Sequence, residues 1–128
     1  MLMKKDKLKK LITSIFIKHK LNKNHASICA EALVNAELVG APSHGLSRLK
    51  MYCDRINKKV INPRPKIKIK KISQSISHID ANNSIGFVAA DLAIKKAIFH
   101  AQKTGLGMVA VKNSGHYGLS GYYAEQAV

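Results

Sequence analysis

Two short segments of the chain, 43–48 and 113–118, each place a histidine among small and polar residues. His44 is followed four residues later by Arg48, and His116 lies in a glycine-rich run. An imidazole exchanges a proton near neutral pH, whereas a guanidinium keeps its charge and binds a carboxylate through paired hydrogen bonds. The two segments therefore indicate a carbonyl or alcohol redox site for a small organic acid, with a proton donor beside a fixed cation.

The first segment is predicted to open a helix that begins at Ser43 or His44 and reaches about Asn57. Residues four apart share a face of a helix, so His44, Arg48 and Tyr52 would form one polar stripe. Arg48 would then hold a carboxylate beside His44 as proton donor, and Ser43 would be either a helix cap or a substrate contact. An ordinary capped helix with a solvated polar face is the competing interpretation of this spacing.

The second segment follows a short apolar strand, predicted as a buried strand over 108–111, and precedes a helix that begins at Leu119. A strand that leads into a glycine-rich loop and a helix N-terminus is a frequent location for sites in α/β proteins, and such an N-terminus favours anions. His116 lies between Gly115 and Tyr117, where the backbone can approach a ligand closely. The glycine spacing is not the dinucleotide-binding fingerprint, so a tight strand–helix turn is the competing interpretation.

The elements that must position these segments follow from the hydrophobic periodicity. Apolar residues at helical spacing predict a first helix around 8–15 and a second from Asn22 or Asn24 to Gly40. Further along, the pattern predicts strands at 66–70 and about 76–80, a turn at 81–84, and a helix over 86–102 with a face of small residues. We expect an α/β fold in which a helical N-terminal segment, 1–62, precedes the start of an α/β cofactor and substrate domain, 63–128, with short strands and helices packed on a sheet.

Composition narrows the function classes. The formal net charge of +15 suggests a small basic nucleic-acid-binding module as the alternative function, but only three of the 22 basic residues are arginines and aromatic residues make up 5% of the chain. Proteins that bind nucleic acids favour arginine forks and aromatic stacking platforms, so we expect no nucleic-acid partner.

There is no apolar run long enough for a membrane span, and we expect a cytoplasmic protein. Cys29 and Cys53 are predicted to be buried thiols, and no histidine has a metal-ligand spacing, so no metal is expected.

Taken together, the two segments resemble the malate/L-lactate dehydrogenase family, which is unrelated to the Rossmann-type lactate dehydrogenases. The matching stretches are Ala36-Glu37-Leu38-Val39-Gly40, Ser43-His44-Gly45 with Arg48-Leu49 and Tyr52, and Asn113-Ser114 with His116, Gly118, Gly121 and Tyr123-Ala124. Their order, spacing and distance from the N-terminus all agree with the family, and the resemblance covers nearly the whole chain.

The resemblance implies hydride transfer between NAD or NADP and a small 2-hydroxy or 2-oxo carboxylate, of the malate, lactate or sulfolactate type. It also implies a homodimer and a distinctive non-Rossmann fold. His44, with Ser43 beside it, resembles the proton donor assigned in some members, and His116 resembles the acid/base histidine proposed in others. Arg48 and Tyr52 match substrate-pocket positions. The sequence leaves open which histidine is the proton donor.

The chain departs from the family in two respects. Gly86 is followed by Phe87, where members often have a glycine-glutamine pair. Family chains are also about twice this length or more, so we expect an incomplete fold whose cofactor-binding residues lie mostly beyond residue 128. We therefore expect the isolated chain to be inactive, which NADH oxidation with 2-oxo acids by the purified chain would disprove. An inactive remnant is a further alternative.

Overall fold

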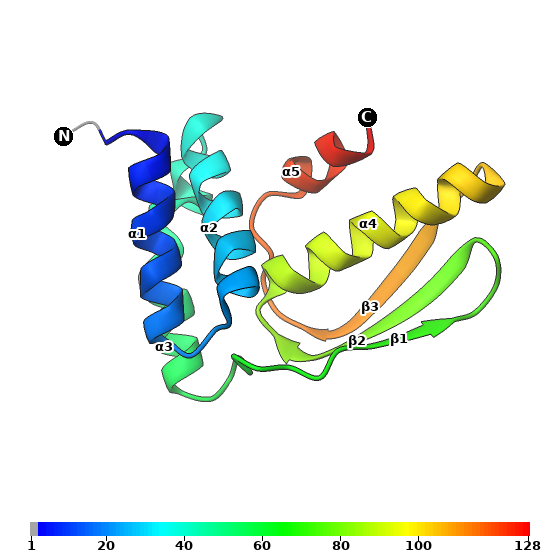
Figure 1. Cartoon of the computed structure of the whole chain (residues 1–128), viewed down its shortest axis with the longest axis horizontal. Coiled ribbons are helices and arrows are strands. Elements are labelled where there is room, and N and C mark those ends of the chain that lie inside the picture. Colours follow the sequence, from blue (N-terminus) through cyan, green and yellow to red (C-terminus); the bar gives the residue numbers. More distant parts are fainter. Residues whose placement is uncertain (1–2) are drawn as a thin grey trace.

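Helices form the first part of the chain, and a small sheet with one long helix forms the second (Figure 1). The computed structural model describes residues 3–128. The first part contains α1 (Lys5–Lys18), α2 (Lys23–Leu38), two 3₁₀ turns, η1 (Pro42–His44) and η2 (Leu46–Arg48), and α3 (Leu49–Asn57). The second part contains β1 (Lys68–Lys71), β2 (Ile76–Ser84), α4 (Gly86–Thr104), β3 (Met108–Ser114), α5 (Ser120–Ala124) and a last 3₁₀ turn, η3 (Glu125–Ala127). No helix in the described part of the chain is long and apolar enough to cross a membrane.

Helices α1 and α2 pack against each other through apolar faces. Ile12 and Phe16 of α1 and Leu33 of α2 are almost completely buried, as the periodicity of the sequence predicts. The Asn22 side chain accepts a hydrogen bond from the His25 backbone N–H at 2.8 Å, which caps the start of α2. The second predicted helix is therefore confirmed, and Asn22 is its cap.

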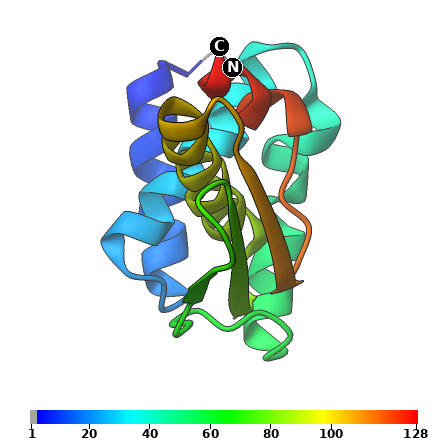
Figure 2. The same ribbon diagram turned by 90° about the vertical axis from the view of Figure 1, so that its right-hand side faces the viewer.

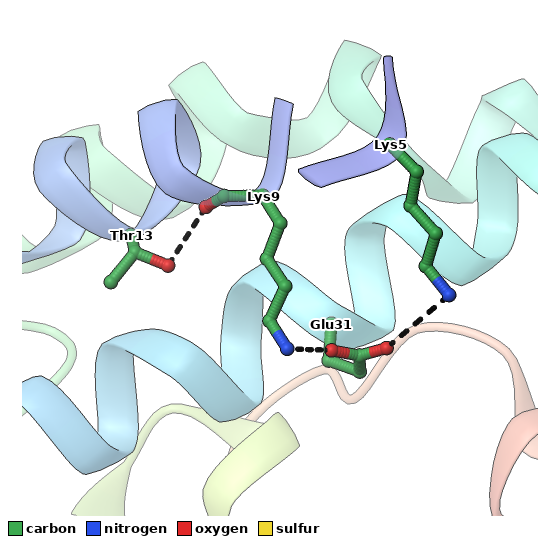
Figure 3. Close-up of polar contacts among 4 residues, drawn as sticks. All are labelled: Lys5, Lys9, Thr13 and Glu31. Carbon is green, nitrogen blue, oxygen red and sulfur yellow. Dashed lines mark hydrogen bonds and ion pairs between the residues drawn. The ribbon is translucent and has the colours of Figure 1, made fainter. Parts of the chain in front are cut away.

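Ion pairs join the same two helices at the surface (Figure 3). The Glu31 carboxylate of α2 contacts the ammonium group of Lys9 and lies 3.9 Å from that of Lys5. The Thr13 hydroxyl donates to the Lys9 carbonyl oxygen at 2.8 Å. Such exposed pairs stabilise a fold by about 0–1 kcal/mol each, so the apolar contacts hold the two helices together.

The sheet has the strand order β1-β2-β3, and α4 lies along one of its faces (Figures 1 and 2). β1 and β2 are antiparallel, and β2 and β3 are parallel, so α4 is the connection that parallel strands require. Ile79 of β2 is fully buried beneath α4, and the Ser77 hydroxyl is 2.7 Å from His100 Nε2 of that helix. The fold class predicted from the sequence is confirmed.

A single apolar core joins the two parts of the chain. It combines α1, α2 and α3 with the first residues of α4, where Phe87 and Val88 are buried. Cys29 belongs to this core, and both Cys29 and Cys53 are buried free thiols, as predicted. Burial raises the pKa of both cysteines, because a thiolate is poorly solvated in an apolar interior. The start of α4 is consequently held firmly against the helices.

Three predicted elements differ in the structure. The helix predicted from Ser43 or His44 begins only at Leu49, because two 3₁₀ turns separated by Gly45 replace its first part. The predicted turn at 81–84 instead belongs to β2, where an irregular pairing accommodates positive φ angles at Asn82 and Asn83. The strand predicted as buried over 108–111 runs to Ser114 and is largely exposed, because β3 is an edge strand of the sheet among residues 3–128.

Candidate functional site: two histidines and an arginine

The structure brings the two histidine segments together. The rings of His44 and His116 are stacked with their centroids 6.0 Å apart and an interplanar angle of 22°. The chain after β3 passes the start of α4 to reach this position beside the helices (Figure 1). Residues that are 72 positions apart in the sequence thus share one site.

Two 3₁₀ turns rather than one α-helix carry Ser43, His44 and Arg48. Pro42 opens the first turn, and Gly45, with φ −97° and ψ −133°, separates it from the second. The Ser47 hydroxyl donates to the Pro42 carbonyl oxygen at 2.7 Å, which ties the second turn to the first. Each turn therefore presents its own side chain to the site, so the polar stripe predicted on a continuous helix is wrong in its geometry.

Glu37 fixes the junction between these turns. Its carboxylate accepts the Leu46 backbone N–H at 2.7 Å. A Cβ atom on Gly45 would lie 2.1 Å from the carboxylate oxygen, so glycine is the residue that leaves room for Glu37. The carboxylate thus occupies the space beside Gly45 and sets the direction in which the chain continues to Arg48.

We expect Glu37→Ala to loosen this junction locally while the rest of the fold stays intact. A hydrogen bond of this kind is worth about 1 kcal/mol, so the Leu46 amide should exchange with solvent several-fold faster. Glu37→Gln retains an acceptor and should have a smaller effect. Amide hydrogen exchange measured by NMR checks this, with Glu125→Ala as control, because Glu125 is exposed and its side chain forms no hydrogen bond or ion pair with residues 3–128. Unchanged Leu46 exchange in Glu37→Ala would show that the carboxylate does not hold the junction.

Ser43 and Arg48 both contact the polar groups around His44. The Ser43 hydroxyl lies 3.0 Å from His44 Nδ1, and Arg48 Nε donates to the Ser43 carbonyl oxygen at 2.8 Å. That bond uses only one of the guanidinium donors, and the side chain is exposed. The terminal nitrogens of Arg48 can therefore bind an incoming carboxylate while Nε anchors the side chain.

Tyr52 reaches the site from within the core. Its side chain is 1% exposed, its ring packs on Phe87 with centroids 4.9 Å apart, and its hydroxyl lies 2.7 Å from His116 Nδ1. Burial, together with the nearby Cys29, raises the pKa of Tyr52 to about 12. The hydroxyl therefore stays protonated at neutral pH and can act as a hydrogen-bond donor.

The loop that carries His116 is shaped by two glycines. A Cβ atom on Gly86 would lie 2.3 Å from the His116 carbonyl oxygen and 2.4 Å from that of Gly115, so only glycine lets the loop close on α4. Gly118 adopts a φ of +79°, a conformation that favours glycine, and its Cα faces the Phe87 ring. The backbone thereby holds His116 beside Tyr52.

The electrostatic surroundings of the two histidines are positive. Desolvation by burial lowers the pKa of His116, and the nearby cationic groups His44, Arg48 and Arg55 lower it further. His116 is therefore predominantly neutral at pH 7, and the positive potential favours an anionic ligand. The described residues contain no group of three or more histidine, cysteine or carboxylate side chains that could hold a metal ion.

The comparison with protein families agrees with this geometry. The sequence profile of the family described as malate/L-lactate dehydrogenase matches residues 3–128, which is nearly all of the chain. The chain belongs to the malate/L-lactate dehydrogenase family. The resemblance of its histidine segments to that family is thus confirmed.

Several family members are similar to this chain over a third of their own length. The malate dehydrogenase of Pyrococcus abyssi is 42% identical over 96% of this chain and 34% of that protein. The L-sulfolactate dehydrogenase of Methanocaldococcus jannaschii is 38% identical over all of this chain and 37% of that protein. The solved malate dehydrogenase of Pyrococcus horikoshii superposes with a TM-score of 0.96 at 38% identity, covering 99% of this chain and 36% of that one.

A groove beside His116 fits part of the nicotinamide cofactor that family membership implies. It has a volume of about 440 Å³ and lies between α4, β3 and the loop. The small face of α4 forms one wall, and two serines contribute hydroxyl groups to the lining, which includes Gly86, Ala90, Ala93, Val111, Ser114 and Ser120. This groove suits a planar, largely apolar ring, but the described residues offer no glycine-rich phosphate-binding loop. They therefore fit one part of a dinucleotide and not the whole.

Three contributors to the site were not predicted from the sequence as site residues. Glu37 holds the 3₁₀ junction, Phe87 packs beneath Tyr52 and Gly118, and the Gly118 N–H points at His116. Glu37 and Gly118 lie in stretches that resemble the family, and this resemblance is the sequence feature that could have identified them as site residues. Nothing in the sequence indicates that Phe87 lies beneath the site, because this depends on the tertiary contact between the rings of Phe87 and Tyr52.

Proposed function

We propose that this chain provides the substrate-binding part of an NAD(P)-dependent dehydrogenase that acts on a small 2-hydroxy or 2-oxo carboxylate. The observation that carries the proposal is the convergence of His44, His116 and Arg48, together with family membership. The proposed substrate class is of the malate, lactate or sulfolactate type, because similar family members are named malate and sulfolactate dehydrogenases and the family description names L-lactate. In this account, residues 1–62 form a helical segment and 63–128 open the cofactor and substrate domain.

The site residues have distinct roles in the proposed reaction. In the direction of reduction, Arg48 binds the substrate carboxylate and so places the carbonyl carbon near both imidazoles. Ser43 orients His44 through its 3.0 Å hydrogen bond, and the histidines supply the proton that the carbonyl oxygen takes up. The nicotinamide cofactor, when bound, supplies the hydride for the carbonyl carbon. Hydride and proton together convert the 2-oxo acid to the 2-hydroxy acid.

The remaining parts of the proposal follow from the family. Ureidoglycolate dehydrogenase (NAD(+)) of Escherichia coli and (2R)-3-sulfolactate dehydrogenase (NADP(+)) of Chromohalobacter salexigens are 32% and 34% identical to this chain. Either nicotinamide dinucleotide is therefore compatible with the fold. We also propose that the complete enzyme acts as a cytoplasmic homodimer.

A chimeric enzyme tests this function. Residues 1–128 would replace the matching N-terminal third of the M. jannaschii L-sulfolactate dehydrogenase, with which they align over their full length. We expect the purified chimera to oxidise NADH or NADPH with a 2-oxo acid, and to lose at least 100-fold in turnover when His44 and His116 are both replaced by alanine, since acid–base groups contribute about 10²–10⁴-fold. A chimera that melts as cooperatively as the parent enzyme but shows no turnover with 2-oxo acids would contradict the proposal.

A further inference from the structure

We propose that Tyr52 is a positioning residue that, together with the Gly118 backbone N–H, holds His116 as the neutral tautomer with its proton on Nε2. Under the proposed function, on which this second step rests, His116 is then a hydrogen-bond donor to the substrate oxygen, and His44 is the histidine that exchanges the proton. This assignment separates the roles of two residues that the sequence could not distinguish.

The first support is the pair of groups around His116 Nδ1. The Gly118 N–H donates to this nitrogen at 3.3 Å, and the Tyr52 hydroxyl lies 2.7 Å from it. A backbone N–H can only donate, so Nδ1 must present its lone pair. The Tyr52 hydroxyl keeps its proton at neutral pH and donates to the same nitrogen. A neutral imidazole with an accepting Nδ1 carries its proton on Nε2.

The second support is that neither donor can readily move away. Tyr52 is 1% exposed, and its ring packs on Phe87. The same Phe87 ring lies where a Cβ atom on Gly118 would be, so Phe87 packs under both groups that face Nδ1. An imidazolium at position 116 would direct a second N–H at the Gly118 N–H, and the buried Tyr52 hydroxyl would have to rotate. The packing of Tyr52 and Gly118 on Phe87 therefore disfavours protonation of His116.

The third support is the contrast with His44. Its Nδ1 contacts the Ser43 hydroxyl at 3.0 Å, and a hydroxyl can either donate to or accept from an imidazole. The hydrogen bond therefore survives both protonation states of His44. Burial lowers the pKa of His116, and the nearby His44, Arg48 and Arg55 lower it further, while the start of α4 contributes only uncharged residues. His44 is the group that can gain and lose a proton without breaking its contacts.

NMR of the ¹⁵N-labelled chain tests the proposal without any need for turnover. Imidazole ¹⁵N shifts and N–H couplings identify which nitrogen carries the proton. We expect a single Nε2–H tautomer for His116 that takes up its second proton below the ordinary pKa of histidine, because burial lowers the pKa of this group. In Tyr52→Phe, Nδ1 loses its stronger donor, so the pKa of His116 should rise and the Nδ1–H tautomer should appear, while the backbone spectrum stays folded.

Tyr117→Phe is the matched control. It removes a tyrosine hydroxyl from the same loop, but that hydroxyl lies 3.1 Å from Ser120 Oγ and has no contact with His116, so the titration of His116 should be unchanged. A dominant Nδ1–H tautomer in the wild-type chain, or protonation of His116 above the ordinary pKa of histidine, would overturn the proposal. The chimera distinguishes this proposal from the proposed function. If the chimera shows no turnover while His116 keeps its Nε2–H tautomer, the proposed function is contradicted and the role of Tyr52 is not.

Discussion

Replacing Gly86 with alanine should destabilise the chain and displace His116 from Tyr52. The new methyl group would lie within 2.4 Å of two carbonyl oxygens, those of Gly115 and His116, and neither backbone group is the end of a flexible side chain. The loop must therefore move away from α4. Overpacking of this kind costs about 1–3 kcal/mol in the free energy of unfolding. The effect should be large because the start of α4 belongs to the buried core.

Urea unfolding monitored by circular dichroism measures the loss of stability, and the His116 imidazole signals report the loop. Gly121→Ala is the control, because a Cβ atom there meets nothing within 4 Å and the glycine lies in α5. Alanine is favoured over glycine in a helix, so this variant should be unchanged or slightly more stable. Equal stabilities for the two variants would show that the loop does not close on Gly86 as described.

Replacing Arg48 with alanine should weaken substrate binding far more than cofactor binding. A charge-assisted pair between guanidinium and carboxylate contributes about 1.5–3 kcal/mol, which corresponds to roughly a 10–100-fold loss of affinity. In the chimeric enzyme we expect KM for the 2-oxo acid to rise by about that factor while KM for the nicotinamide cofactor stays within about twofold. Arg48→Lys keeps the charge but not the fork, so it should fall between wild type and alanine.

Two further measurements complete the Arg48 test. Arg55→Ala removes an equal charge from α3 and should leave the KM for the 2-oxo acid nearly unchanged, because the exposed Arg55 side chain forms no hydrogen bond with residues 3–128. If Arg48→Ala raised both KM values equally, the side chain would support the fold of the site and would not bind the carboxylate.

Much of the fold was predictable because local sequence patterns decide it. Residues such as Ile12 and Leu33 lie at helical spacing, and the structure buries them in α1 and α2. The exposure of β3 was not predictable in the same way. Its residues Met108 and Val111 look like core residues by type, yet they are 54% and 38% exposed, since burial of a strand depends on what packs beside it.

The residues of the candidate site could be selected from the sequence, but the geometry that brings them together could not. The types and spacing of His44 and Arg48 indicated acid–base chemistry beside a carboxylate-binding group. Their actual placement on two 3₁₀ turns depends on Glu37 and Gly45, whose interaction spans the connection between α2 and η2. The burial of Tyr52 depends on the packing of α4 against it, and the helical spacing of His44, Arg48 and Tyr52 does not predict that contact.

We propose that residues 43–52 and 113–118 form one carboxylate-binding acid–base site. Titration of the ¹⁵N-labelled chain with malate, followed by NMR of the Arg48 Nε–H and the imidazoles of His44 and His116, tests it most directly. We expect saturable shifts of all three groups with a common dissociation constant in the wild-type chain and in Arg55→Ala, and no shift of the two imidazoles in Arg48→Ala. Imidazole shifts in Arg48→Ala that match those of the wild-type chain, or shifts confined to the scattered surface lysines, would contradict the proposal.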